Sequence, residues 1–148
     1  MKEGSPIAVR EIDHVVLRVR DVDRMRQFYC EVLGCSIEKH QERVGLLQLR
    51  AGRSLIDLVD VTGTIGRAGG APPGTEGRNV DHVCLRVEPF DAEAIMAFLR
   101  ERGVPHGSVE SRYGAEGEGP SLYLTDPEGN TIELKGPPWE AAGAATGG

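Results

Sequence analysis

Apolar and polar residues alternate in residues 12–19, IDHVVLRV, and this pattern predicts a β-strand that carries His14 on one face. Apolar residues then recur every three or four positions in residues 22–33, which predicts a helix. Asp21 is typical of the residue that begins a helix, and Gly34 is typical of the residue that follows its end. The pattern therefore starts with a strand and a helix.

Three more strands are predicted after this helix, because short apolar runs are separated by turn residues. They are expected at residues 35–41, 44–50 and 54–61. The same order then occurs a second time. The second copy is expected to have a strand at 80–87, a helix from about 91 to 102, and strands near 108–112, 120–125 and 130–135. The chain thus predicts two βαβββ units.

One sequence segment shows the duplication most clearly. IDHVVLRV at residues 12–19 returns as VDHVCLRV at residues 80–87. Each copy holds one histidine at the same place, His14 in the first and His82 in the second. An internal repeat indicates two copies of one structural unit. We therefore expect each unit to offer an imidazole to a shared site.

The chain divides into five segments on this basis. Residues 1–9 are an N-terminal extension, residues 10–61 and 80–136 are the two modules, and residues 137–148 are expected to be a flexible tail. Residues 62–79 are rich in glycine and proline, which is typical of a linker. The fold class is expected to be α+β.

Composition excludes several kinds of partner. The net charge of -6 argues against nucleic acid and anionic membranes, and no stretch is apolar and long enough to span a bilayer. The N-terminus lacks the apolar segment of a signal peptide, and the three cysteines show no CxxC spacing. These features predict a reduced, cytoplasmic protein whose partner is a small molecule. Cys84, inside an apolar strand, is expected to lie in the core.

Two acidic residues stand between aliphatic ones at matching positions of the two modules, Asp57 in the first and Glu133 in the second. A carboxylate in such a strand is costly unless it is paired or binds a metal. If the two modules face each other, these carboxylates can converge with His14 and His82. Two imidazoles and two carboxylates suit a divalent transition metal: manganese, iron, cobalt, nickel or zinc.

The fourth ligand is open at this point. Asp57 has a shorter side chain than a glutamate, so Gln48 on the preceding strand could replace it. His40 and His106 have no partner in the other module and are interpreted as ordinary residues. The predicted ligands are therefore His14, His82 and Glu133, with Asp57 or Gln48 as the fourth.

Three segments carry a resemblance to a known family: IDHV at 12–15, FYCEVLG at 28–34 and SLYLTDPEGNTIEL at 121–134. On these segments the chain resembles the vicinal oxygen chelate superfamily, over about residues 10–136. This superfamily contains glyoxalase I, fosfomycin-resistance proteins, methylmalonyl-CoA epimerase, extradiol dioxygenases and bleomycin-resistance proteins. The resemblance implies paired βαβββ modules that form a cupped mixed sheet around a metal, commonly in a homodimer. It places the family's metal positions on His14, His82 and Glu133, and its optional fourth position on Asp57.

The resemblance to glyoxalase I implies a metal-stabilised enediolate and two carboxylate ligands, one of which moves the proton. Asp57 and Glu133 stand at these positions, and Arg18 stands where that enzyme holds glutathione. The chain has Leu58-Val59-Asp60 where glyoxalase I carries Asn-Trp-Gly. We therefore expect a lyase or isomerase for a small oxygenated substrate, which glutathione could carry.

Other branches of the superfamily remain open. Tyr123 stands where extradiol dioxygenases carry a tyrosine and is expected to contact the substrate, as Arg112 is. The additional catalytic histidines of those enzymes have no counterpart here. Residues 112–121, which begin with Arg112, are expected to form a glycine-rich loop where fosfomycin-resistance proteins bind their substrate. The epimerase branch would use Gln48 as a neutral fourth ligand. Bleomycin-resistance proteins bind a ligand without a metal, and metal content separates that class from the others.

Overall fold

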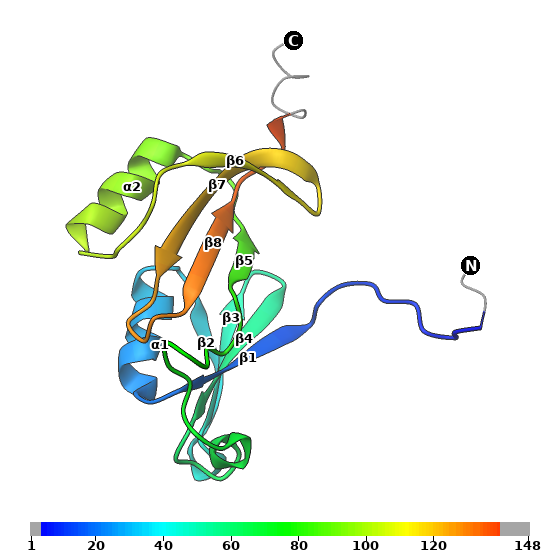
Figure 1. Ribbon diagram of the computed structural model, residues 1–148, viewed down its shortest axis with the longest axis vertical. Coiled ribbons are helices and arrows are strands. Elements are labelled where there is room, and N and C mark those ends of the chain that lie inside the picture. Colours follow the sequence, from blue (N-terminus) through cyan, green and yellow to red (C-terminus); the bar gives the residue numbers. More distant parts are fainter. Residues whose placement is uncertain (1–3, 140–148) are drawn as a thin grey trace. The chain divides into compact units, whose positions relative to one another are not determined.

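The computed structural model describes residues 4–139. These residues divide into two compact units, unit 1 up to Pro72 and unit 2 from Pro73 (Figure 1). The division falls within the glycine- and proline-rich segment, residues 62–79. The last part of the expected tail, residues 140–148, lies outside the described residues. No helix in residues 4–139 is long and apolar enough to cross a membrane.

The described residues of unit 1 form one α-helix and four strands. The elements are β1 (His14–Val19), α1 (Val22–Glu31), β2 (Ser36–Gln41), β3 (Leu46–Ala51) and β4 (Ser54–Asp60), with short 3-10 helices at Glu42–Val44 and Gly66–Gly69. The strands form one sheet in the order β1-β4-β3-β2, in which only the β1–β4 pair is parallel. Unit 1 is therefore a βαβββ module, as the sequence predicts.

Unit 2 repeats this arrangement. Its elements are β5 (Val83–Arg86), α2 (Ala92–Glu101), β6 (Glu110–Gly114), β7 (Gly117–Thr125) and β8 (Thr131–Lys135). The strand order β5-β8-β7-β6 is that of unit 1, and the β5–β8 pair is again the parallel one. The prediction of an α+β fold made of paired βαβββ modules is confirmed.

Each sheet has one apolar face that forms a core. In unit 1, α1 packs against β3 and β4, and its Met25 and Tyr29 are fully buried. In unit 2, Leu122 and Ile132 of the sheet and Leu99 of α2 are buried. Burial of each such side chain stabilises the fold by about 1.5–3 kcal/mol. Because side chains alternate along a strand, the opposite face of each sheet is left for polar residues.

Local signals fix the ends of the elements. Asp21 caps α1 by accepting a hydrogen bond from the Arg24 backbone N–H at 3.0 Å, and Asp91 caps α2 in the same way. The turn before β8 is closed by Asp126, whose carboxylate accepts hydrogen bonds from the backbone N–H groups of Glu128 and Asn130, both at 2.9 Å. These three aspartates fix where α1, α2 and β8 begin.

Two expectations about unit 2 are wrong. The strand expected at 80–87 is shorter, because β8 begins only at Thr131 and residues 80–82 have no ladder partner in it; His82 thus immediately precedes β5. The loop expected at 112–121 is instead the β6–β7 hairpin, in which Gly114 pairs with Gly117. Glycine permits the positive φ of 120° at position 117, so a tight turn replaces the loop.

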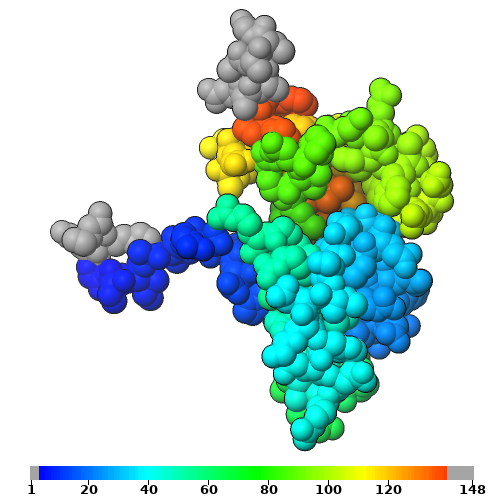
Figure 2. Space-filling model, turned by 180° about the vertical axis from the view of Figure 1, so that it is seen from behind, coloured from blue at the N-terminus to red at the C-terminus, as the bar shows by residue number. Residues whose placement is uncertain are grey.

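The N-terminal segment has no helix or strand from residue 4 to residue 13. Figure 2 shows it reaching away from the sheet of unit 1, and Ile7, Val9 and Ile12 are each at least two-thirds exposed. Near its end, the backbone carbonyl oxygen of Asp13 accepts a hydrogen bond from the Leu55 N–H, which aligns β1 beside β4. This alignment places His14 at the start of the polar face.

Candidate functional site

The polar face of unit 1 carries His14 and Asp57 on neighbouring strands. Val16 of β1 lies opposite Asp57 of β4 in the parallel register, and His14 lies two positions before Val16 on the same face. His14 is nearly half exposed, whereas Asp57 is buried. The alternation read from the sequence thus places a histidine and a carboxylate on one face of one sheet.

His14 is held by the residue before it. Its Nδ1 lies 2.7 Å from an Asp13 carboxylate oxygen, and this hydrogen bond raises the pKa of His14 above its ordinary value. Desolvation lowers this pKa in part, and the negative charge of Asp57 raises it in the same direction as Asp13 does. Because Nδ1 is engaged by Asp13, Nε2 is the ring nitrogen that remains for a ligand.

Asp57 is a buried carboxylate with one oxygen unsatisfied. Its Oδ2 accepts a hydrogen bond from the Gln48 side-chain amide at 3.2 Å, across the register pair of β3 and β4. Its Oδ1 is buried and has no hydrogen-bond partner. A buried, unpartnered carboxylate oxygen is destabilising unless a cation or a donor reaches it. We refer to Asp13, His14, Gln48 and Asp57 as the first half-site.

Arg18 lies further along β1, where its guanidinium binds a loop of its own unit. Its Nε and Nη2 donate hydrogen bonds to the Gly66 carbonyl, at 3.1 and 2.9 Å, and Nη2 also donates to the Gly70 carbonyl at 2.7 Å. Nη1 donates to the Ala71 carbonyl at 3.0 Å. Arg18 therefore orders part of the segment that the sequence indicates as a linker. Its role toward a substrate remains a prediction.

The polar face of unit 2 carries His82 and Glu133. The Nδ1 of His82 lies 2.6 Å from Asp81, which repeats the pair formed by His14 and Asp13. Its Nε2 lies 3.2 Å from Glu133 Oε1. Glu133 is buried, with 6% of its surface exposed. Unit 2 thus brings together the histidine and the carboxylate that the sequence assigns to it.

Glu133 is also held from the other side. Its Oε2 accepts a hydrogen bond from Ser121 Oγ at 2.6 Å, and Ser121 is completely buried. Arg112 donates through Nη1 to Ser121 Oγ at 3.1 Å and to the Ser121 carbonyl at 3.3 Å. We refer to Asp81, His82, Ser121 and Glu133 as the second half-site.

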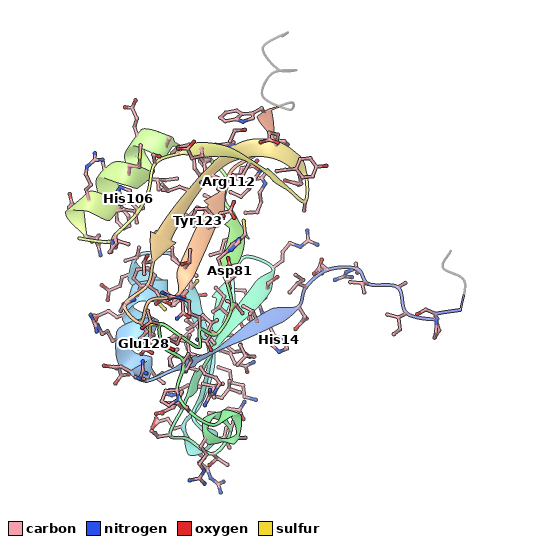
Figure 3. The ribbon with its side chains drawn as sticks, viewed as in Figure 1. His14, Asp81, His106, Arg112, Tyr123 and Glu128 are labelled. Carbon is pink, nitrogen blue, oxygen red and sulfur yellow. The ribbon has the colours of Figure 1, made fainter. Side chains whose placement is uncertain are left out.

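Tyr123 contacts both Arg112 and His82 at this half-site. The Arg112 guanidinium lies 4.5 Å from the centroid of the Tyr123 ring, and Figure 3 shows the two side chains close together on β6 and β7. The Tyr123 ring in turn contacts the His82 ring edge to face at 5.3 Å. Arg112 and Tyr123, both predicted to contact a substrate, therefore lie on the same face as His82 and Glu133.

Cys84 does not lie in the core, contrary to the expectation from the sequence. It is exposed and lies opposite Glu133 in the β5–β8 register. Partial burial of the sulfur, the negative charge of Glu133 and a hydrogen bond with Glu133 raise the pKa of Cys84 to about 11. The thiol is therefore protonated at neutral pH, which argues against a nucleophile.

The donors of the two half-sites fit a divalent metal chemically. Within residues 4–139, no three side chains of the His, Cys, Asp or Glu type gather closely enough to hold an ion. Each half-site does supply one imidazole and one buried carboxylate. The unpartnered Asp57 Oδ1 is the atom that a cation would satisfy. Nitrogen and oxygen donors of this kind are common ligands of transition metals.

Reasoning from the sequence did not identify some residues that lie in the half-sites or beside them. Asp13 and Asp81 belong to the repeated phrase, so the repeat itself could have identified them. Cys84 lies two positions after His82, and strand alternation alone would have placed it on the histidine face. Ser121 could be found only from the contacts between strands, because its hydroxyl reaches Glu133 across the β7–β8 pair.

The chain is similar to a known protein family along nearly its whole length. The family model of the glyoxalase/bleomycin resistance protein/dioxygenase superfamily matches residues 11–134. The virulence protein STM3117 of Salmonella typhimurium is 31% identical over 134 residues, which cover 89% of this chain and 88% of that protein. Methylmalonyl-CoA epimerase of Mus musculus is 26% identical over 141 residues, 90% of this chain and 78% of that protein.

Solved structures agree with the sequence comparisons. The crystal structure of STM3117 matches with a TM-score of 0.74 and 27% identity, and covers 88% of this chain and 99% of its own. TnmS3, an antibiotic binding protein from Streptomyces sp. CB03234, matches with a TM-score of 0.65 and 27% identity, over 88% of this chain and 98% of its own. The similar proteins thus include both an enzyme and a binding protein.

Proposed function

Because the chain belongs to the glyoxalase/bleomycin resistance protein/dioxygenase superfamily, we propose that it is a metal-dependent lyase or isomerase of the glyoxalase I type. Its substrate would be a small oxygenated molecule, which a thiol such as glutathione could carry. The observation that carries the proposal is the repeated pair of a histidine and a buried carboxylate, one on each sheet. Proton transfer beside a carbonyl is promoted by a Lewis acid and needs a base. These pairs would hold the metal that supplies the Lewis acid, and their carboxylates can supply the base.

We propose that His14, Asp57, His82 and Glu133 bind one divalent metal: nickel, zinc, cobalt, manganese or iron. The two half-sites would have to meet, within one chain or across a homodimer. Support comes from the Nδ1 contacts of both histidines, because a carboxylate on one ring nitrogen orients the other toward a metal. The metal, when bound, would stabilise negative charge on a substrate oxygen.

The chain's own residues would bind the substrate and move the proton. Glu133 is the first candidate for the base, because Oε1 faces an imidazole while Oε2 is hydrogen-bonded; Asp57 is the second. Arg112 and Tyr123 would contact the substrate from β6 and β7. Arg18 would hold an anionic substrate group, for which it would have to exchange its loop carbonyls for that group.

A second candidate is an epimerase that moves a proton next to a thioester carbonyl. The similarity to methylmalonyl-CoA epimerase favours it. Gln48 is the neutral side chain that could serve as the fourth ligand, because it lies in hydrogen-bond contact with Asp57. Both candidates use a metal and a carboxylate base, so they differ in the substrate rather than in the step.

The test measures exchange of the substrate proton next to the carbonyl with solvent deuterium. Protein loaded separately with each metal is incubated in D₂O with the hemithioacetal of methylglyoxal and glutathione, and separately with methylmalonyl-CoA. We expect metal-dependent turnover of one substrate, and a loss of about 100-fold or more in Glu133→Gln. His40→Ala is the matched control, because His40 lies on β2 outside both half-sites.

Oxygen uptake with a catechol, without turnover of either carbonyl substrate, would contradict the proposal and indicate a dioxygenase. Ligand binding by metal-free protein without turnover would indicate a binding protein, the class to which the antibiotic binding protein TnmS3 belongs. We also propose that the protein is a cytoplasmic homodimer. Light scattering of the purified protein tests whether it is a dimer.

A further inference from the structure

The hydrogen bonds around Glu133 form a chain with a defined direction. Arg112 has only N–H groups to offer, so at Nη1 it must donate to Ser121 Oγ. The Ser121 hydroxyl has a single proton, and with Arg112 on its lone pair this proton points to Glu133 Oε2, 2.6 Å away. The two carboxylate oxygens of Glu133 are therefore not equivalent.

We propose that Ser121 is a positioning residue that holds Oε2 of Glu133 and leaves Oε1 as the working oxygen. This inference rests on the proposed function for the role of Glu133. Oε1 is the oxygen on the His82 side, 3.2 Å from Nε2. A proton taken from a substrate carbon therefore goes to Oε1 and returns from it, while the proton of Ser121 stays on its hydroxyl.

The surroundings of Ser121 support this role over a purely structural one. Ser121 is completely buried, and its hydroxyl contacts Arg112 on one side and Glu133 on the other. A hydrogen bond from a hydroxyl to a carboxylate is charge-assisted and short, so it restricts rotation of the carboxylate strongly. Arg112 is fixed in turn by the face of the Tyr123 ring at 4.5 Å. The carboxylate is thereby oriented before any ligand arrives.

The test compares Ser121→Ala, which removes the hydroxyl, with Ser121→Thr, which keeps it. Ser108→Ala is the matched control, because Ser108 also donates to a glutamate, Glu110 at 2.8 Å, but on the exposed part of the same unit. Cobalt is the probe, and its affinity is measured by competition with a chelator. We expect Ser121→Ala to weaken cobalt binding by about 10- to 100-fold and to shift the cobalt absorption bands. Ser121→Thr should restore both, and Ser108→Ala should change neither.

A second readout needs no metal. The infrared carboxylate band of Glu133 is identified in metal-free protein as the band lost in Glu133→Gln. This band should move in Ser121→Ala and return in Ser121→Thr, because one oxygen loses its hydrogen bond. A band that stays in place in Ser121→Ala overturns the inference. If the wild type binds cobalt and Ser121→Ala binds it with the same affinity, the inference is also overturned. Absence of cobalt binding by the wild type overturns the proposed function instead, and the infrared band then decides the role of Ser121 alone.

Discussion

The first and second half-sites lie on sheets with the same strand order, and their histidines are each held by the preceding aspartate. Their carboxylates differ. Glu133 has Ser121 on one oxygen and His82 beside the other, whereas Asp57 has Gln48 on one oxygen and nothing on the other. The repeat therefore determines which residues face the site. The neighbouring strand determines how firmly each carboxylate is held.

The largest effect is expected from the second half-site. Glu133→Gln should reduce metal affinity by more than about 100-fold, because changes that only reorient a ligand already cost 10- to 100-fold. The change also replaces the charge-assisted hydrogen bond between Ser121 and the carboxylate by a weaker bond to a neutral amide, so metal-free stability should fall. Isothermal titration with the metal and thermal unfolding of the metal-free protein measure the two effects. Wild-type affinity in this variant would remove Glu133 from the ligand set.

The first half-site should respond in two opposite ways. Asp57→Asn should weaken metal binding, yet raise the metal-free free energy of unfolding by about 1 kcal/mol, because a buried charge with an unpartnered oxygen is removed. The same two measurements apply. A fall in the free energy of unfolding of Asp57→Asn, like that expected for Glu133→Gln, would contradict this. The two carboxylates would then be stabilised to a similar extent by their neighbours.

The aspartates before the histidines should have equal, smaller effects. Asp13→Asn and Asp81→Asn should each reduce metal affinity by about 10-fold, because their contacts with Nδ1 are nearly the same length, 2.7 and 2.6 Å. Asp23→Asn, an exposed acidic residue in α1, is the control. A change in only one of the two variants would show that the half-sites bind the metal unequally.

The smallest effect concerns a thiol. The pKa of Cys84 is raised to about 11, so alkylation should be slow at pH 8 and accelerate as the pH rises toward 11. Glu133→Gln should lower this pKa, because the negative charge that disfavours the thiolate is gone, and alkylation at pH 8 should become faster. Cys35 is the internal control: its pKa is also raised to about 11, but by burial and by Cys30. Mass spectrometry of each cysteine reports both rates; equal rates before and after the change would mean that Glu133 does not act on Cys84.

Most of the fold could be predicted from the sequence, because the hydrophobic pattern and the capping residues are local signals. The helix after Asp21 and the turn at Asp126 are examples. The site was harder to predict because it depends on contacts between strands. Ser121 has no local signal, and the hairpin at Gly117 was mistaken for a loop since its glycines suit both structures. The apolar neighbours of Cys84 predict a core position, but its spacing of two residues from His82 places it on the histidine face.

Metal content decides whether the histidines and carboxylates of the two half-sites bind a metal. Untagged protein, purified without chelators and titrated with nickel, cobalt, zinc, manganese and iron in turn, is analysed for metal per chain. We expect about one transition metal per chain, lost in His14→Ala and in His82→Ala and retained in His40→Ala. No bound metal after incubation with every ion would contradict it, and the histidines would then be structural.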